Sequence, residues 1–182
     1  MPKALTLWAL VLSALAAVAC EAVPLGARSE PPPGAALNLQ TPEGWTLAQS
    51  IEEEGDRRSR LWLRRDESLD GWTQRVALRS WNGKGPGEGS LRRLLDRRLG
   101  QFQVSCPGAL TWRVLEDHGH GLLYEVVAEP CLGFAAHHMV GYLMETADGR
   151  HDLSYIRKGG VLTEGPRHAW LTWVQQLRST AI

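Results

Sequence analysis

The chain after residue 44 is divided into short apolar runs separated by turn residues, and this spacing limits the fold more than any other feature. The runs occupy residues 45–51, 61–63, 72–81, 110–116, 122–128, 138–146 and 152–157. Two of the separating segments, Asp117–Gly121 and Ala147–Arg150, have the residues of tight hairpin turns. Short runs with tight connections predict neighbouring antiparallel strands in one sheet.

The run from Trp72 to Trp81 shows the clearest period of two. One face carries Trp72, Gln74, Val76, Leu78 and Ser80, and the other carries Thr73, Arg75, Ala77, Arg79 and Trp81. Because only the first face is largely apolar, we expect a half-buried strand with that face toward the core. The glycine-rich segment 82–87 follows and is expected to be a flexible loop.

Two further segments have helical periodicity. The first begins at Ser90, a suitable cap, and its apolar stripe consists of Leu91, Leu94, Leu95, Leu99 and Phe102. We expect its four arginines to be solvated on the outer face. The second begins near Pro166 and its stripe consists of Ala169, Trp170, Trp173, Val174 and Leu177. The order of elements predicts an α+β fold, in which an antiparallel β-sheet carries an internal and a C-terminal amphipathic helix.

The amino terminus differs in character from the rest of the chain. Lys3 is the only charged residue before Glu21, and an apolar segment extends from Ala4 to Val18. The segment is too short for a stable membrane span and is typical of a secretory signal. We therefore expect residues 1–19 to be a signal peptide that directs the chain to the cell envelope.

The end of this segment, Ala17-Val18-Ala19-Cys20, resembles the lipobox of bacterial lipoproteins. The resemblance implies a lipid on Cys20, with acyl chains such as palmitate, and anchoring to the outer membrane facing the periplasm. Ala17 also suits the ordinary signal peptidase, so cleavage to a soluble protein stays open. Residues 20–38 are rich in proline and would form a tether. A single α+β domain would then occupy residues 39–182.

The chain has three cysteines, an odd number that leaves one unpaired in an oxidising compartment. Cys106 and Cys131 lie in the folded region and can pair, which leaves Cys20 for the lipid. Such a disulfide would stabilise the fold by about 3 kcal/mol through loop closure. The alternative is two buried free thiols.

The charge balance excludes some classes of function. Removal of residues 1–19 takes away Lys3 alone and leaves a net charge near −1. This balance gives no reason to expect a nucleic acid partner, nor a strong field that would steer an anionic lipid or substrate. The expected partners are therefore the membrane, through the anchor, and another envelope protein.

A longer stretch resembles a known group of proteins. Glu67–Val76 is similar to the ESLxxWTExxTVQ stretch of small secreted proteobacterial proteins of unassigned function. Those proteins also share a helix, the sequence seen here as Cys106-Pro107-Gly108, a second cysteine at Cys131 and a late glycine at Gly141. The group is distantly similar to the PsbP-like α/β fold of extrinsic photosystem proteins. The resemblance supports the fold and the disulfide and implies no catalytic residues.

No motif for catalysis or for a cofactor stands out. The sequence has no G-x-S-x-G, and the serines at 68, 80, 90 and 154 have no distinctive context. The glycine-rich segment lacks the ending of a phosphate loop, and the run Glu52-Glu53-Glu54 lacks EF-hand spacing. His118 and His120 are weak candidates for metal binding, and exposed turn histidines are the expected alternative. We accordingly expect no cofactor and no metal.

Two hypotheses for function remain. The first is a non-enzymatic binding or accessory module of the envelope, with Asp70 and Trp72 as a candidate binding surface. Acidic residues beside a tryptophan can line a groove, although a loop cap and a core anchor explain them equally well. The second hypothesis is a periplasmic enzyme, or a weak metal-binding protein, that uses a pocket without a sequence signature.

Overall fold

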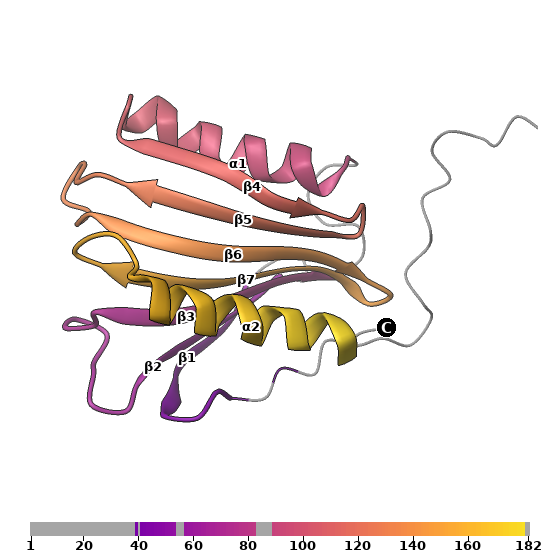
Figure 1. The fold of residues 1–182 in the computed structure, drawn as a ribbon, viewed down its shortest axis with the longest axis horizontal. Coiled ribbons are helices and arrows are strands. Elements are labelled where there is room, and N and C mark those ends of the chain that lie inside the picture. The colour runs from indigo at the N-terminus through magenta and orange to yellow at the C-terminus, as the bar shows by residue number, and fades with distance from the viewer. Residues whose placement is uncertain (1–38, 40, 54–56, 83–88, 181–182) are drawn as a thin grey trace, which may run out of the picture.

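The computed structural model describes residues 39, 41–53, 57–82 and 89–180, and shows one antiparallel sheet of seven strands with two helices (Figure 1). The predicted signal peptide, Cys20, the tether and most of the glycine-rich loop lie outside the described residues. The elements are β1 (Trp45–Glu53), β2 (Arg57–Arg64), β3 (Gln74–Asn82), α1 (Leu91–Ser105), β4 (Leu110–Asp117), β5 (Gly121–Ala128), β6 (His137–Thr146), β7 (Gly149–Lys158) and α2 (Glu164–Thr180). In this part of the chain, no helix is long and apolar enough to cross a membrane.

The sheet has the strand order β1-β2-β3-β7-β6-β5-β4. All pairs are antiparallel, as the sequence predicted, and the chain returns to the middle of the sheet when β7 pairs with β3. The architecture is therefore a mixture of α and β in which the sheet dominates. The junction between β3 and β7 brings together residues that are about 75 positions apart, such as Arg79 and Asp152.

The two faces of the sheet support different helices. Along β5, Leu122, Tyr124 and Val126 belong to a core cluster with α1, whereas Leu123 belongs to a second cluster with α2. Because successive strand residues point to opposite faces, the helices lie on opposite sides of the sheet. We refer to these sides as the α1 face and the α2 face.

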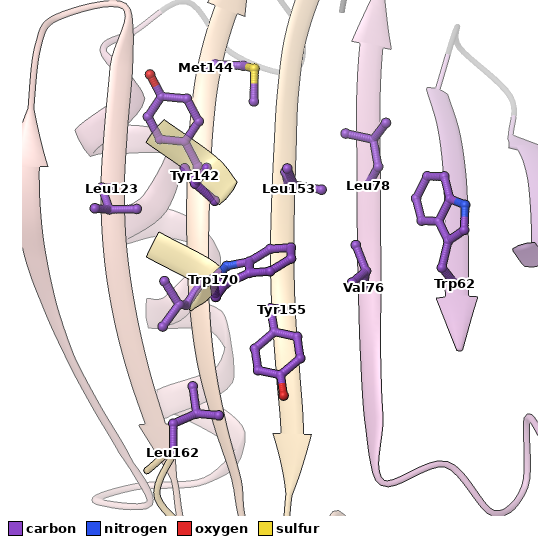
Figure 2. Packing of buried hydrophobic residues seen from close by; sticks show 12 residues of the cluster. Trp62, Val76, Leu78, Leu123, Tyr142, Met144, Leu153, Tyr155, Leu162 and Trp170 are labelled. Carbon is purple, nitrogen blue, oxygen red and sulfur yellow. Dashed lines mark hydrogen bonds between the residues drawn. The ribbon is translucent and has the colours of Figure 1, made fainter. Parts of the chain in front are cut away.

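The core on the α2 face extends over most of the sheet. Its members include Trp62 of β2, Val76 of β3 and Leu153 of β7. Trp170 of α2 lies over β6 and β7 beside Tyr155, with ring centroids 5.1 Å apart (Figure 2). The Trp170 indole also donates a hydrogen bond to the Val140 carbonyl at 3.1 Å, which fixes the helix on the sheet.

The core on the α1 face is less extensive. Leu91, Leu95 and Leu99 of α1 are buried against β4, β5 and β6, and Ser90 caps the helix by accepting a hydrogen bond from the Arg93 amide. Toward β3, the cluster ends at Ile156 of β7. Among the described residues, none of its members comes from β1, β2 or β3. Leu63 of β2, opposite Arg75 in the sheet register, is also buried on this side but is not a member of the cluster.

Two glycines leave space for tyrosine rings that pack over the adjacent strand. A Cβ at Gly141 would lie 2.2 Å from the Tyr124 ring, and a Cβ at Gly121 would lie 2.1 Å from the Tyr142 hydroxyl. Each ring therefore packs directly over the backbone of the adjacent strand. As a result, the hydroxyl of Tyr124 on β5 reaches Asp152 on β7, two strands away.

The predicted pairing of the folded cysteines is confirmed. Cys106, which follows α1, forms a disulfide with Cys131 in the connection between β5 and β6, with a Cα–Cα distance of 6.0 Å. The bond ties the end of α1 to the sheet.

Candidate functional site

Trp72 lies on the opposite face from the one that its alternation with Val76 predicted. The strand begins at Gln74, so the period of two does not extend back to Trp72, which packs against the core on the α1 face. Glu67 holds this loop in place by accepting hydrogen bonds from the Thr73 amide at 2.9 Å and from the Thr73 hydroxyl. Glu67 is thus a loop cap, and the preorganised loop presents the Trp72 ring.

Two cations lie over the Trp72 ring. The Arg75 guanidinium carbon is 4.3 Å from the ring centroid, and the Lys158 ammonium nitrogen is 4.0 Å from it. Both distances are within the range of a cation–π interaction. The predicted acidic partner, Asp70, lies in the exposed turn before Trp72. The charges in contact with the ring are therefore cationic rather than acidic.

On the same face of the sheet, α1 contributes a further arginine. Arg98 forms an ion pair with Asp152 of β7, whose side chain is 1% exposed. The Asp152 carboxylate also accepts a hydrogen bond from the Tyr124 hydroxyl at 2.7 Å. Arg79 of β3 is directly opposite Asp152 in the sheet register. The expectation that all four arginines of α1 are only solvated is therefore wrong for Arg98, whose side chain is 27% exposed.

We define the arginine cluster as Arg75, Arg79, Arg98 and Lys158, with Trp72 and Asp152. Burial lowers the pKa of Arg75, and the Arg79 charge lowers it further. Burial likewise lowers the pKa of Arg98; Arg79 again acts downward, whereas Tyr124 acts upward. Both shifts include a like-charge contribution from Arg79, as expected for guanidinium groups on one face of the sheet. Within the described part of the chain, Asp152 is the single carboxylate that pairs with any of them.

The strand positions between these cations carry small residues. Ala77 of β3 is opposite Ser154 of β7, which is opposite Gly141 of β6, so the three residues form a row across the sheet. Arg75 and Arg79 flank Ala77 on the same face of β3. The Arg75 Nε atom is buried without a hydrogen-bond partner. Most buried polar atoms have a hydrogen-bond partner, so this atom distinguishes Arg75 from the paired arginines of the Glu125 cluster.

A second charged cluster lies on the α2 face, and both of its arginines pair with its carboxylate. Glu125 of β5, which is 4% exposed, accepts hydrogen bonds from Arg113 at 2.8 Å and from Arg167 of α2 at 2.8 Å. Its other partner is His138, at 2.9 Å. Burial raises the pKa of Glu125, but the hydrogen bonds from Arg167, Arg113 and His138 outweigh burial and lower it to about 2. We refer to these residues as the Glu125 cluster.

His138 has a structural position in the Glu125 cluster. Its Nδ1 atom accepts a hydrogen bond from the Leu162 amide at 2.7 Å, so its Nε2 atom carries the proton that faces Glu125. The imidazole therefore links β6 to the segment that leads into α2. The buried carboxylate of Glu125 and both ring nitrogens of His138 are therefore hydrogen-bonded within the protein.

A third polar cluster brings together a hydroxyl, an imidazole and a carboxylate, and no sequence motif indicates it. His151 Nδ1 lies 2.9 Å from the Ser80 hydroxyl, and His151 Nε2 lies 3.3 Å from Asp148. Burial lowers the pKa of His151, despite the upward effect of Asp148, so the ring is neutral at pH 7. These are the groups of a nucleophilic triad.

The surroundings of Ser80 do not complete such a triad. Ser80 lies within β3, opposite Arg58 of β2 and His151 of β7, so the strand is paired on both sides. The neighbouring backbone amides are used in these ladders, whereas an acyl-transfer site needs free donors for an oxyanion. His151 is also bound at 2.9 Å to Thr146, whose hydroxyl binds Asp148 in the same turn. The arrangement is better explained as a brace for the turn between β6 and β7.

The weak metal candidates lie in the turn between β4 and β5. His118 and His120 are exposed, and His118 Nε2 lies 3.0 Å from a Glu116 oxygen. Across the described residues, no group of three or more histidine, cysteine, aspartate and glutamate side chains is arranged to hold a metal ion. The structure therefore does not bring these histidines together with further ligands.

Comparison with known proteins does not assign this chain to a family. No family model matches this sequence, and no curated protein is significantly similar to it. The candidate site therefore depends on geometry, and the arginine cluster is the charged group with the least compensation among the three.

Proposed function

We propose that this protein is a lipid-anchored protein of the bacterial cell envelope, and that its domain is a non-enzymatic binding module. In this proposal the arginine cluster is the binding surface, and Cys20 carries the lipid. The observation that carries the proposal is a set of four cations on one face of the sheet, of which, among the described residues, Arg98 alone pairs with a carboxylate. The apolar cluster on this face ends at Ile156 of β7.

Other features support this function. The signal-like amino terminus and the disulfide are consistent with an oxidising compartment outside the cytoplasm. The two helices act as covers, one on each face, and α1 supplies Arg98 beside β7. A rigid sheet that holds cations in fixed positions is suited to recognition, because little side-chain entropy is lost on binding.

Affinity capture from native membranes tests the proposal. The full chain should recover a stoichiometric partner or ligand, and the variant Arg75→Gln/Arg79→Gln should lose it. The matched control is Arg58→Gln/Arg92→Gln, which removes the same charge from exposed ion pairs on β2 and α1. Equal recovery by both double variants would show that the arginine cluster is not the binding surface.

The anchor can be tested separately. The variant Cys20→Ser should release the protein from membranes, and the mass of the wild-type protein should exceed that of the cleaved polypeptide by a diacylglyceryl group. A membrane-free wild-type protein with an unmodified Cys20 would contradict the lipid anchor.

The contact between Ser80 and His151 makes an esterase-like enzyme the second candidate. This function predicts that a fluorophosphonate probe labels Ser80 and that Ser80→Ala and His151→Gln abolish the labelling. Because the amides around Ser80 are used in the sheet, we expect no labelling.

A further inference from the structure

The arginine cluster contains more positive charge than the folded protein needs. Arg98 has a carboxylate partner in Asp152, but within the described residues Arg75, Arg79 and Lys158 have no ion pair with an acidic residue. Arg79 is opposite Asp152, the partner of Arg98, in the sheet register, and Arg75 lies on the same face of β3 as Arg79. Like charges that the folded state brings together oppose folding unless an anion balances them.

The shape of the arginine side chains limits the class of anion that they can bind well. Arginine presents a planar fork of donors that matches the oxygens of phosphate and carboxylate groups. Here the forks come from two elements: Arg75 and Arg79 lie on either side of Ala77 on β3, and Arg98 of α1 reaches Asp152 on β7. Donors from several directions suit a tetrahedral group with several oxygens. The charge also favours a phosphate, because a single carboxylate would leave most of the excess uncompensated.

We propose that the arginine cluster binds a phosphate group, with Arg75 and Arg79 as the principal ligands and Arg98 as a third. Arg98 is held in position by Asp152, which is itself fixed by the Tyr124 hydroxyl. Lys158 and the Trp72 ring complete one side of the site. This inference rests on the proposed function and specifies the ligand class of the same surface.

Two sources could supply the phosphate: a soluble phosphate ester or the headgroup of an anionic lipid. Flat membrane surfaces are usually met by exposed, flexible lysines, which interact at long range. In this cluster Arg79 is exposed, but the Arg75 Nε atom is buried and the Arg98 side chain is 27% exposed. Partly buried arginines suit a compact group that enters the site, so a soluble or polymer-borne phosphate ester is the source that the structure favours.

Isothermal titration calorimetry with inorganic phosphate tests the ligand class. The full chain is titrated at an ionic strength fixed with sodium chloride, because screening weakens all surface charges. We expect a dissociation constant of about 1 mM or below. Arg79→Gln should weaken binding by about tenfold or more, because it removes a charged hydrogen bond. The control Arg92→Gln, which removes an exposed arginine from α1, should leave the affinity unchanged.

A parallel arm separates the two sources. Co-sedimentation with phosphatidylglycerol vesicles, compared with phosphatidylcholine vesicles, measures headgroup binding. The preferred source predicts phosphate binding without selective sedimentation of the Cys20→Ser protein. Sedimentation that inorganic phosphate competes away, and that Arg79→Gln reduces, would support the phosphate site and assign it to lipid headgroups.

Other outcomes would overturn the inference. These are an absence of phosphate binding, equal affinity in Arg79→Gln and wild type, or acetate binding as tight as phosphate at the same ionic strength. Circular dichroism of Arg79→Gln confirms that the exposed substitution leaves the fold intact. If phosphate fails to bind but the membrane capture still depends on Arg75 and Arg79, the binding module stands and only its ligand class is wrong.

Discussion

The Glu125 cluster and the arginine cluster each contain one buried carboxylate, but they differ in how many of their cations pair with it. In the Glu125 cluster, two arginines and one histidine share one carboxylate, so each of these side chains is paired with Glu125. In the arginine cluster, Asp152 pairs with Arg98 and already binds Tyr124, while Arg75 and Arg79 lie nearby without a carboxylate. The first arrangement stabilises the fold, and the second holds charge for something outside it.

The difference shows how a structural network can be told from a candidate binding site. The Glu125 carboxylate keeps a low pKa although it is buried, because its donors outweigh the burial. The pKa of Arg75 is lowered by burial and by a like charge, and no opposite charge offsets the shift. Both groups are perturbed, so the perturbation alone does not identify function. The presence or absence of a compensating partner does.

The largest expected effect comes from breaking the compensated cluster. Glu125→Gln leaves the arginines and His138 without their shared anion, and should lower the free energy of unfolding by about 3–5 kcal/mol. Urea denaturation measures this loss. The control is Glu129→Gln, an exposed glutamate at the end of the same hairpin, which should change stability by less than about 0.5 kcal/mol. A similar small change in Glu125→Gln would mean that its hydrogen bonds contribute little.

Acidification should weaken the same cluster. The pKa of Glu125 is about 2 in the folded protein, below its ordinary value of 4.5, so its contribution is complete above about pH 4.5. The contribution is then lost as the pH falls toward 2. Asp148 and His151 also have lowered pKa values and reduce stability on acidification. The pH profiles of wild type and Glu125→Gln should therefore converge below pH 4.5, and parallel profiles would contradict the assignment.

A smaller effect is expected from the hydrogen bond between Tyr124 of β5 and Asp152 of β7. Tyr124→Phe removes the hydroxyl that donates to buried Asp152 and should cost about 1–3 kcal/mol. Tyr155→Phe is the matched control, because its hydroxyl donates to Gln74 in a part-buried position. Thermal unfolding of both variants compares them. A smaller loss in Tyr124→Phe than in Tyr155→Phe would show that Asp152 does not depend on the Tyr124 hydroxyl.

Local patterns predicted most of the fold. The alternation from Val76 to Ser80 and the leucine stripe after Ser90 identified a strand and a helix, because burial of one face sets their period. The extrapolation to Trp72 was wrong, since that residue precedes the strand. Hydrogen bonds from Thr73 to Glu67 within the same loop hold the segment that carries Trp72, and no sequence period encodes them.

The candidate site was less accessible from sequence. Arg79, Arg98 and Asp152 come from three elements, and they meet through the pairing of β3 with β7, which the strand pattern does not specify. Composition was also misleading, because a net charge near zero for the whole chain concealed a local excess of arginine. Trp72 was a useful signal, but the partners predicted for it were acids from the same loop rather than cations.

The central claim is that the arginine cluster is uncompensated in the free protein, and two matched substitutions test it most directly. Urea denaturation of Arg167→Gln and Arg79→Gln is measured at low ionic strength in buffer without phosphate. Arg167→Gln should lose about 2 kcal/mol, because it removes a charged hydrogen bond to Glu125. Arg79→Gln should equal or exceed the wild type in stability, because it relieves repulsion. A loss in Arg79→Gln as large as that in Arg167→Gln would contradict the account.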